Sequence, residues 1–585
     1  MALVLAVMML LVSVSALAAT IENKTDHSYD AYQIFAGTHV AGETTGKLGV
    51  TGWGSGINGD AFLTALKSNS AFNKTTGTGE DAVTENVFKD AKTAADVASI
   101  LGDNATDKSD FAKAFALEAE KHLKTEKTAI AAGATTAELL GYYLLVDTQT
   151  LEDGDAKNLS LLEVTGKEKF TIEKKYDKPS LDKDIIEDDA NVEAADKNIG
   201  DTITYELRGT LPSNLGDFTK YYFEFSDTLS KGQAYQGDIK VYLNEVKAKN
   251  DITGKFTIKH STDKGATDKT DGASATEFSI KNEDILAAST GIAGVKGSDV
   301  IIVRYTAILT KDATVGSTGN ENKAKLTYSS NPNYNGDGEK KDTPEDKTLV
   351  FTYELDTTKV DGAEVTVPDG ATYYNADDTA AADASEAAYA TADGVTYTKD
   401  AAGKWHKAIE GAEFKLYRMN GTDKEYVVLE ASSTKVKSWT KTIGEATVLT
   451  SAANTGLFEV SGLDAGTYYL VETKAPTGYN LLNDPVKVVI AATITGSTTG
   501  TVGAADDHDK VAPALTALTI AVNDGTAQNG KLATGEVKDT IANNGGNVLP
   551  STGGIGTTIF YVAGSILVLA AAILLITKRR MGAND

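Results

Sequence analysis

Two groups of residues in this chain combine a lysine, an acid and an asparagine on runs that read as β-strands. They are Lys183, Asp227 and Asn322 in the middle of the chain, and Lys359, Glu472 and Asn543 further along. If such residues were buried, burial would lower the pKa of the lysine and raise that of the acid, by up to roughly 3–5 units. The neutral amine would then be a nucleophile and the protonated acid a proton donor.

Strand parity places each of these polar residues on an apolar face, because alternate residues of a strand share a face. The apolar partners are Tyr353 and Leu355 for Lys359, Tyr468 and Leu470 for Glu472, Val537 and Ile541 for Asn543, Leu181 and Ile185 for Lys183, Phe223 and Phe225 for Asp227, and Leu326 and Tyr328 for Asn322. A single residue of this kind is more often a strand end whose polar head reaches water. Two complete sets in consecutive regions favour burial.

The first region of the chain mixes strands and helices. Aromatic and β-branched runs at 29–37 and 141–147 predict strands. Between them, one helical face is formed by Phe111, Phe115, Ala119 and His122. Residues 20–170 therefore predict an α+β domain.

The rest of the chain predicts β-sandwiches. In 171–347, short strands alternate with Gly, Asn and Asp turns, and 348–546 repeat that pattern. We expect the Ala- and Asp-rich segment 376–394 to be a solvated insertion, and 494–512 to be a second loose stretch. All-β domains therefore dominate the predicted fold.

Both ends of the chain carry apolar runs. Residues 1–19 predict a signal peptide cut near Ala18 or Ala19, although the usual basic start is missing, which leaves the true start codon open. Residues 556–577 hold no charge and have the length of a transmembrane helix, and the basic residues of 578–585 would stay cytoplasmic. We therefore expect the chain between these ends to be exported.

Composition excludes several classes of function. The 585 residues include no Cys, so an exported chain of this kind cannot use disulfides, and the net charge of −26 argues against nucleic-acid binding. The six His residues show no metal-ligand spacing, and no Walker loop, nucleophile elbow or His-Glu-x-x-His motif is present. We expect no enzyme, no metal and no cofactor.

Several motifs resemble those of one family, the major (backbone) pilins of Gram-positive sortase-assembled pili. YYLVETKAPTGY (468–479) and GAEFKLYR (411–418) resemble the collagen-adhesin B-type, prealbumin-like domain, whereas FSDTL (225–229) and NKAKLTYSSNP (322–332) resemble the A-type, isopeptide-forming domain. With AYQIF (31–35) and WGSGI (53–57), the likeness covers nearly the whole exported chain. It implies tandem immunoglobulin-like β-sandwiches after the α+β domain.

The segment 547–554 resembles a sortase sorting signal. Its motif is Leu549, Pro550, Ser551, Thr552 and Gly553, followed by the apolar span and the basic tail. Pro fixes one dihedral angle and Gly removes side-chain bulk, so the segment can enter a protease-like cleft. The resemblance implies that a sortase cuts after Thr552 and transfers its acyl group to an amine. The protein would be secreted, and in the membrane only before sorting.

In this family a lysine amine attacks an asparagine side chain, expels ammonia and leaves an intramolecular isopeptide bond. The resemblance therefore implies a Lys359–Asn543 bond promoted by Glu472, and a Lys183–Asn322 bond promoted by Asp227. Asn544 has the wrong strand parity, so Asn543 is preferred. Each bond would join the first strand of its domain to the last strand. It would therefore carry tension that disulfides would otherwise bear, which fits a chain without Cys. Residues 20–170 show no comparable set, and a bond there stays open.

Backbone pilins also use an exposed lysine between their first two domains as the acceptor in polymerisation. The corresponding stretch is 170–183, where strand parity exposes Lys175; the usual Pro and Asn neighbours are missing, and Lys174 is a rival. The implied partners are a sortase, further copies of the chain, minor or tip pilins, and peptidoglycan. The implied function is a pilus shaft in adhesion or colonisation, with an unknown ligand. The alternatives are a wall-anchored adhesin that does not polymerise and a wall-tethered hydrolase.

Overall fold

The computed structural model describes most of the chain. It covers residues 19–39, 48–78, 82–106, 109–148, 159–164, 169–172, 177–261, 276–333, 339–376, 378–400, 402–496, 500–501, 512–546 and 555–581. The predicted signal peptide before residue 19, Lys174, Lys175 and the sorting signal 547–554 lie outside these residues. The signal peptide and the choice of Lys175 over its rival Lys174 therefore stay predictions.

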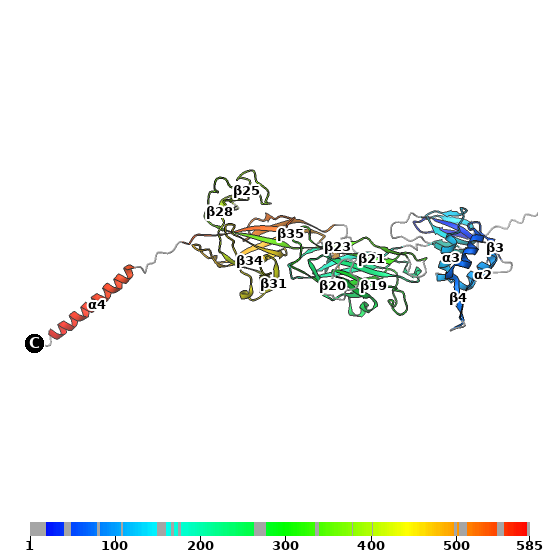
Figure 1. Cartoon of the computed structure of the whole chain (residues 1–585), viewed down its shortest axis with the longest axis horizontal. Coiled ribbons are helices and arrows are strands. Elements are labelled where there is room, and N and C mark those ends of the chain that lie inside the picture. Colours follow the sequence, from blue (N-terminus) through cyan, green and yellow to red (C-terminus); the bar gives the residue numbers. More distant parts are fainter. Residues whose placement is uncertain are drawn as a thin grey trace, which may run out of the picture.

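The chain is arranged as successive modules along one long axis (Figure 1). A blue α+β domain lies at one end, two β domains follow in green and in yellow to orange, and the red C-terminal helix lies at the other end. The predicted mainly β fold with several sheet domains is confirmed.

The first domain contains a five-stranded and a three-stranded sheet, with helices packed against the larger one. The larger sheet has the order β3-β2-β8-β9 with β6 on β2, the smaller has the order β10-β1-β7, and β4 and β5 form a hairpin. The bounds are β1 Ala19–Asn23, β2 Tyr29–His39, β3 Leu48–Trp53, α1 Gly59–Ser68, β4 Asn73–Thr76, β5 Val83–Asn86, α2 Ala94–Asn104, α3 Asp110–Glu120, β6 Thr128–Ile130, β7 Thr135–Leu139, β8 Gly141–Asp147, β9 Leu159–Val164 and β10 Lys169–Ile172.

Helix α3 follows the predicted helical face over most of its length. The Ser109 side chain accepts a hydrogen bond from the Ala112 backbone N–H and so caps its start. Phe115 and Ala119 are buried as predicted. The helix ends at Glu120, so His122 lies beyond it in the following turn.

The middle domain is formed by two facing sheets of seven strands. One has the order β16-β20-β14-β11-β12-β36, with β17 on β20, and the other β13-β23-β21-β15-β19-β18, with β22 on β21. The bounds are β11 Ser180–Glu187, β12 Ala190–Val192, β13 Ala194–Asp196, β14 Thr202–Thr210, β15 Phe223–Leu229, β16 Gln233–Tyr235, β17 Lys240–Leu243, β18 Thr257–Ser261, β19 Glu277–Asn282, β20 Val300–Leu309, β21 Asn320–Ser329, β22 Lys340–Asp342 and β23 Asp346–Phe351. Alternating burial along β15 and β21 fits the predicted sandwich.

The third domain contains a three-stranded sheet, β33-β24-β39, and an eight-stranded sheet, β31-β30-β29-β34-β35-β37-β38, with β32 on β29. A separate small sheet has the order β25-β26-β27-β28. The bounds are β24 Tyr353–Asp361, β25 Thr372–Tyr374, β26 Tyr389–Ala392, β27 Val395–Lys399, β28 Trp405–Lys407, β29 Glu413–Asn420, β30 Asp423–Leu429, β31 Val436–Thr440, β32 Leu449–Thr450, β33 Leu457–Leu463, β34 Gly466–Lys474, β35 Val486–Thr495, β36 Gly500–Thr501, β37 Ala514–Val522, β38 Gln528–Asn529 and β39 Glu536–Asn543.

The prediction that 376–394 is a solvated insertion was wrong for its second half. That half contains β26, which pairs with β25 and β27. Ala390 and Ala392 are buried against Tyr397, because small alternate side chains let this sheet pack on a cluster of its own. The composition of the segment hid that alternation.

The predicted spanning segment forms one helix, α4 (Ile555–Met581). Among the residues that the structure describes, no helix is both long enough and apolar enough to cross a membrane.

The middle and third domains share one hydrophobic core. Strand β23 of the middle domain leads directly into β24 of the third, and the Thr352 hydroxyl between them donates to the Leu463 carbonyl at 3.1 Å. Side chains of both domains belong to the same buried cluster. The lysine-containing strands β11 and β24 therefore both lie in well-packed surroundings.

Candidate functional site

Three strands bring Lys359, Glu472 and Asn543 together in the third domain. Strand β24 runs parallel to its neighbour β39, with Lys359 opposite Ile541 and Asp361 opposite Asn543. Glu472 belongs to β34 of the eight-stranded sheet. The lysine and the asparagine therefore come from one sheet and the acid from another.

The three side chains form a closed set of polar contacts. The Lys359 ammonium donates to Asn543 Oδ1 at 2.5 Å and lies 3.8 Å from Glu472 Oε1. The Asn543 amide nitrogen donates to the two Glu472 carboxylate oxygens at 2.9 and 3.0 Å. The side chains of Lys359 and Glu472 are fully buried, and Asn543 is 1% exposed. The acid thus contacts both the amine and the amide nitrogen.

Burial makes Lys359 easier to deprotonate than an ordinary lysine. It lowers the Lys359 pKa to about 8, against the opposing charges of Glu472 and Asp539. The amine also lies 5.6 Å from the centre of the Phe414 ring, so water is excluded on that side. An appreciable fraction of a nucleophilic neutral amine is therefore present near neutral pH.

The set in the middle domain is built across the two sheets. Lys183 lies on β11 in one sheet, whereas Asp227 on β15 and Asn322 on β21 lie in the other. The Lys183 ammonium donates to Asp227 Oδ2 at 2.7 Å, with both side chains fully buried. Burial raises the Asp227 pKa, and the adjacent Lys183 charge opposes that rise.

Tyr305, on β20, is a member of this site that sequence reasoning missed. Its hydroxyl donates to Asp227 Oδ2 at 2.9 Å and accepts from the Asn322 amide at 2.6 Å. Asp227 Oδ1 and Asn322 Oδ1 are buried without a hydrogen-bond partner among the described residues. The apolar alternation of VIIVRYTAIL (300–309) was a signal that Tyr305 faces the core.

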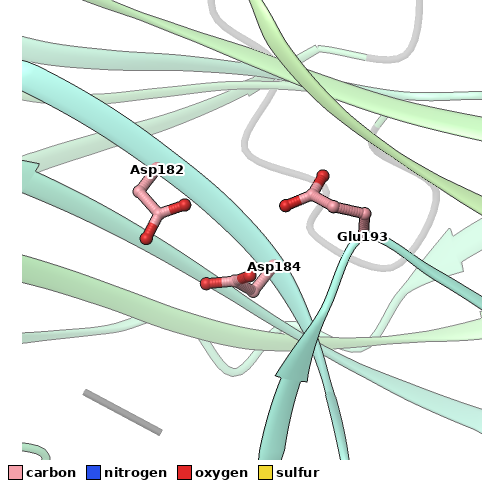
Figure 2. Close-up of side chains that lie close together, drawn as sticks. All are labelled: Asp182, Asp184 and Glu193. Carbon is pink, nitrogen blue, oxygen red and sulfur yellow. The ribbon is translucent and has the colours of Figure 1, made fainter. Parts of the chain in front are cut away.

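A cluster of acids lies beside this site but on the other face of β11. Figure 2 shows Asp182, Asp184 and Glu193, whose nearest carboxylate oxygens all lie within 4.8 Å of one another. Asn191 donates to Asp184 at 2.5 Å. Because Asp182 and Asp184 alternate with Lys183 along the strand, they point away from its amine. The sequence analysis had not singled out this cluster.

Two regions of the chain match known families. Residues 394–503 match the prealbumin-like fold domain, and residues 541–581 match the LPXTG cell-wall anchor motif. The chain is 24% identical over 423 residues to the trypsin-resistant surface T6 protein of Streptococcus pyogenes serotype M6, which covers 69% of each chain. These matches show a prealbumin-like domain and an LPXTG cell-wall anchor in this chain.

Solved structures of pilins are similar to this chain over most of its length. The T6 backbone pilin of S. pyogenes is 16% identical, with a TM-score of 0.43, over 91% of this chain and 98% of that one. The full-length major pilin SpaD of Corynebacterium diphtheriae is 15% identical, with a TM-score of 0.42, over 91% and 97%. The LPXTG motif indicates a surface protein that is anchored to the cell wall.

Proposed function

We propose that this chain is the shaft subunit of a covalent pilus on the cell wall. A sortase breaks the Thr552–Gly553 bond, holds the Thr552 acyl group, and transfers it to the Lys175 amine of the next subunit. A new amide forms and the C-terminal segment that begins at Gly553 is released. Head-to-tail contacts of this kind propagate as open filaments. The support is the order of motif, apolar helix and basic tail, together with the match to the anchor family.

Each of the two β domains is further closed by an isopeptide bond that it forms itself. In the third domain the neutral Lys359 amine attacks the Asn543 side-chain carbonyl carbon. Glu472 accepts the proton that the amine loses and delivers it to the amide nitrogen, which leaves as ammonia. In the middle domain Lys183, Asp227 and Asn322 take the same roles, and the Tyr305 hydroxyl connects the acid to the amide.

One observation carries this proposal: the Glu472 carboxylate contacts both nitrogens between which a proton must move. Its oxygens lie 2.9 and 3.0 Å from the leaving nitrogen, and one of them lies 3.8 Å from the attacking nitrogen. A site built only for stability would more readily be filled with apolar side chains, because buried ion pairs are often no more stable than such packing.

The mass of the purified ectodomain tests this chemistry. We expect the wild-type protein to be lighter than its sequence by two ammonia molecules, one per bond. Glu472→Gln keeps the size of the side chain but cannot shuttle the proton, so this variant should be lighter by one ammonia only.

Glu413→Gln is the matched control, because Glu413 is an acid of the neighbouring strand β29 that pairs with Lys474. It should keep both mass losses. A full-mass wild-type protein, or a Glu472→Gln variant with both bonds, would contradict the proposal.

A further inference from the structure

A second group of carboxylates lies on the face of β24 that is opposite to Lys359. Glu354 and Asp356 occupy alternate positions of β24, with the opposite parity to Lys359. Glu354 is paired with Glu536 on β39, and Asp356 is paired with Glu459 on β33. Residues paired across strands share a face, so four acids meet on one side of a three-stranded sheet.

Three of these acids converge on a single point. The nearest carboxylate oxygens of Glu354, Asp356 and Glu536 all lie within 4.8 Å of one another. Asp356 is 8% exposed, and its Oδ1 atom is buried without a hydrogen-bond partner among the described residues. Burying a carboxylate that lacks a partner is costly. This group of acids therefore contains a buried carboxylate oxygen that no described residue satisfies.

The nearby lysines neutralise only part of the negative charge of these acids. Lys538 is the strand neighbour of Asp356, but its ammonium donates to Asp378 at 2.6 Å. Lys531 donates to Glu536 at 2.8 Å and also contacts Asp378. The group thus keeps an excess of negative charge.

We propose that Glu354, Asp356 and Glu536 bind a calcium ion, with Glu459 at its edge. Hard divalent cations take carboxylate oxygens, and Ca²⁺ accepts the irregular, partly hydrated geometry that acids from separate strands provide, whereas Mg²⁺ requires a near-ideal octahedron. Glu354 and Glu536 are partly exposed, so water can complete the coordination.

This site has a structural consequence that rests on the proposed Lys359–Asn543 bond. Glu354 and Glu536 are paired where the parallel pairing of β24 and β39 begins, and Asp361 and Asn543 are paired where it ends. A cation at the first position therefore holds together the same two strands that Lys359 and Asn543 join at the other. The first and last strands of the domain would be fixed at both ends of their pairing.

Calcium titration of the chelator-treated ectodomain tests the proposal. We expect one Ca²⁺ per molecule by calorimetry, with a dissociation constant of about 10⁻⁴–10⁻³ M, as in other extracellular modules, and a rise in melting temperature. Both signals should be lost in Asp356→Asn and in Glu536→Gln, and Mg²⁺ at equal ionic strength should not replace Ca²⁺. The matched control, Asp423→Asn, removes an acid of β30 that pairs with Lys441 and should bind as wild type does.

The titration has two outcomes that would overturn the proposal. The first is a wild-type protein with neither Ca²⁺ heat nor a change in melting temperature, which would mean that these acids bind no calcium ion. The second is an equal Ca²⁺ response in wild type and in both site variants, which would assign the response to the general negative charge of the chain. If Asp356→Asn fails to fold, the titrations of the wild-type protein and of Glu536→Gln still test whether these acids bind calcium.

Discussion

At the scale of single residues, the two lysine sites depend on how burial changes acid–base behaviour. The Lys359 pKa is lowered to about 8, and the Asp227 pKa is raised. Both shifts favour neutral forms, and both are caused first by loss of solvent. Neutral amines and protonated acids are the reactive species in amide exchange. In the proposed isopeptide chemistry, the burial that strands β24 and β15 provide would therefore activate these groups.

The lowered pKa of Lys359 predicts a pH-dependent stability wherever the bond cannot form. In Glu472→Gln the amine stays free, with a folded-state pKa of about 8 or below, because an opposing charge is gone. In the unfolded chain the lysine pKa is about 10.4. At a pH between the folded-state and unfolded-state pKa values, the unfolded chain therefore binds a proton at Lys359 that the folded chain does not bind. The free energy of unfolding should therefore rise with pH, by up to about 1.4 kcal/mol per unit.

Urea unfolding at pH of about 9 and 10 measures this slope. The matched control is Lys359→Met in the same Glu472→Gln background, which cancels the contributions of all other groups. Equal slopes in the two proteins would show that the pKa of the buried Lys359 amine is not lowered.

Strand parity was sufficient to predict the burial of the six residues in the two sets, but not the burial of acids on the opposite faces of the same strands, such as Asp184 and Asp356. Strand parity could not predict that Tyr305 contacts Asp227 and Asn322. The sequence of β20 does not indicate a contact between the Tyr305 hydroxyl and Asp227. The contact forms only because the sheet that contains β20 faces the sheet that contains β15. The carboxylates of Glu354 and Glu536 were missed for a similar reason, since 182 residues of sequence separate two positions that strand pairing brings together.

At the scale of elements, the two sites connect different structures. Lys359 and Asn543 lie on neighbouring parallel strands of one sheet, β24 and β39. Lys183 and Asn322 lie on β11 and β21, which belong to opposite sheets of the sandwich. A bond in the third domain would therefore lock two strands against sliding, whereas a bond in the middle domain would stop its two sheets from separating.

The position of Tyr305 predicts an effect confined to the middle domain. Tyr305→Phe removes the hydroxyl that donates to Asp227 and accepts from Asn322. We expect an incomplete Lys183–Asn322 bond and a complete Lys359–Asn543 bond, measured by peptide mapping. Leaving these buried groups unpaired should also cost about 1–3 kcal/mol of unfolding free energy.

Tyr235→Phe is the control, because that hydroxyl accepts from the Ile239 backbone and does not reach Asp227 in any described contact. A complete Lys183–Asn322 bond in Tyr305→Phe would assign the tyrosine a packing role only.

Other elements show where sequence patterns fail. The α3 helix was predicted because its apolar residues repeat at helical spacing and Ser109 caps it. The sheet of β25 to β28 was not, since alanines at alternate positions give too weak a contrast with their polar neighbours. Composition suggested solvent exposure there, and only the packing of Tyr397 and Trp405 against those alanines gives the segment a core.

At the scale of the whole molecule, the domains follow one another along a single axis that ends in α4 (Figure 1). Polar contacts also join the middle and third domains, where the Tyr468 hydroxyl donates to Asn198 at 2.9 Å and the Ala465 backbone N–H donates to Asp196 at 2.9 Å. In a fibre linked from Lys175 to Thr552, tension would pass through both β domains. The absence of Cys leaves side-chain amides as the covalent means of resisting it.

The most direct test is peptide mapping by mass spectrometry of pilin released from the wall of living cells. The account predicts three branched peptides, joining Lys183 to Asn322, Lys359 to Asn543, and Lys175 of one subunit to Thr552 of another. Lys175→Ala should lose the last of these together with the high-mass ladder on denaturing electrophoresis, and Lys174→Ala should keep both. Only linear peptides with free lysine side chains at all three positions would contradict the account.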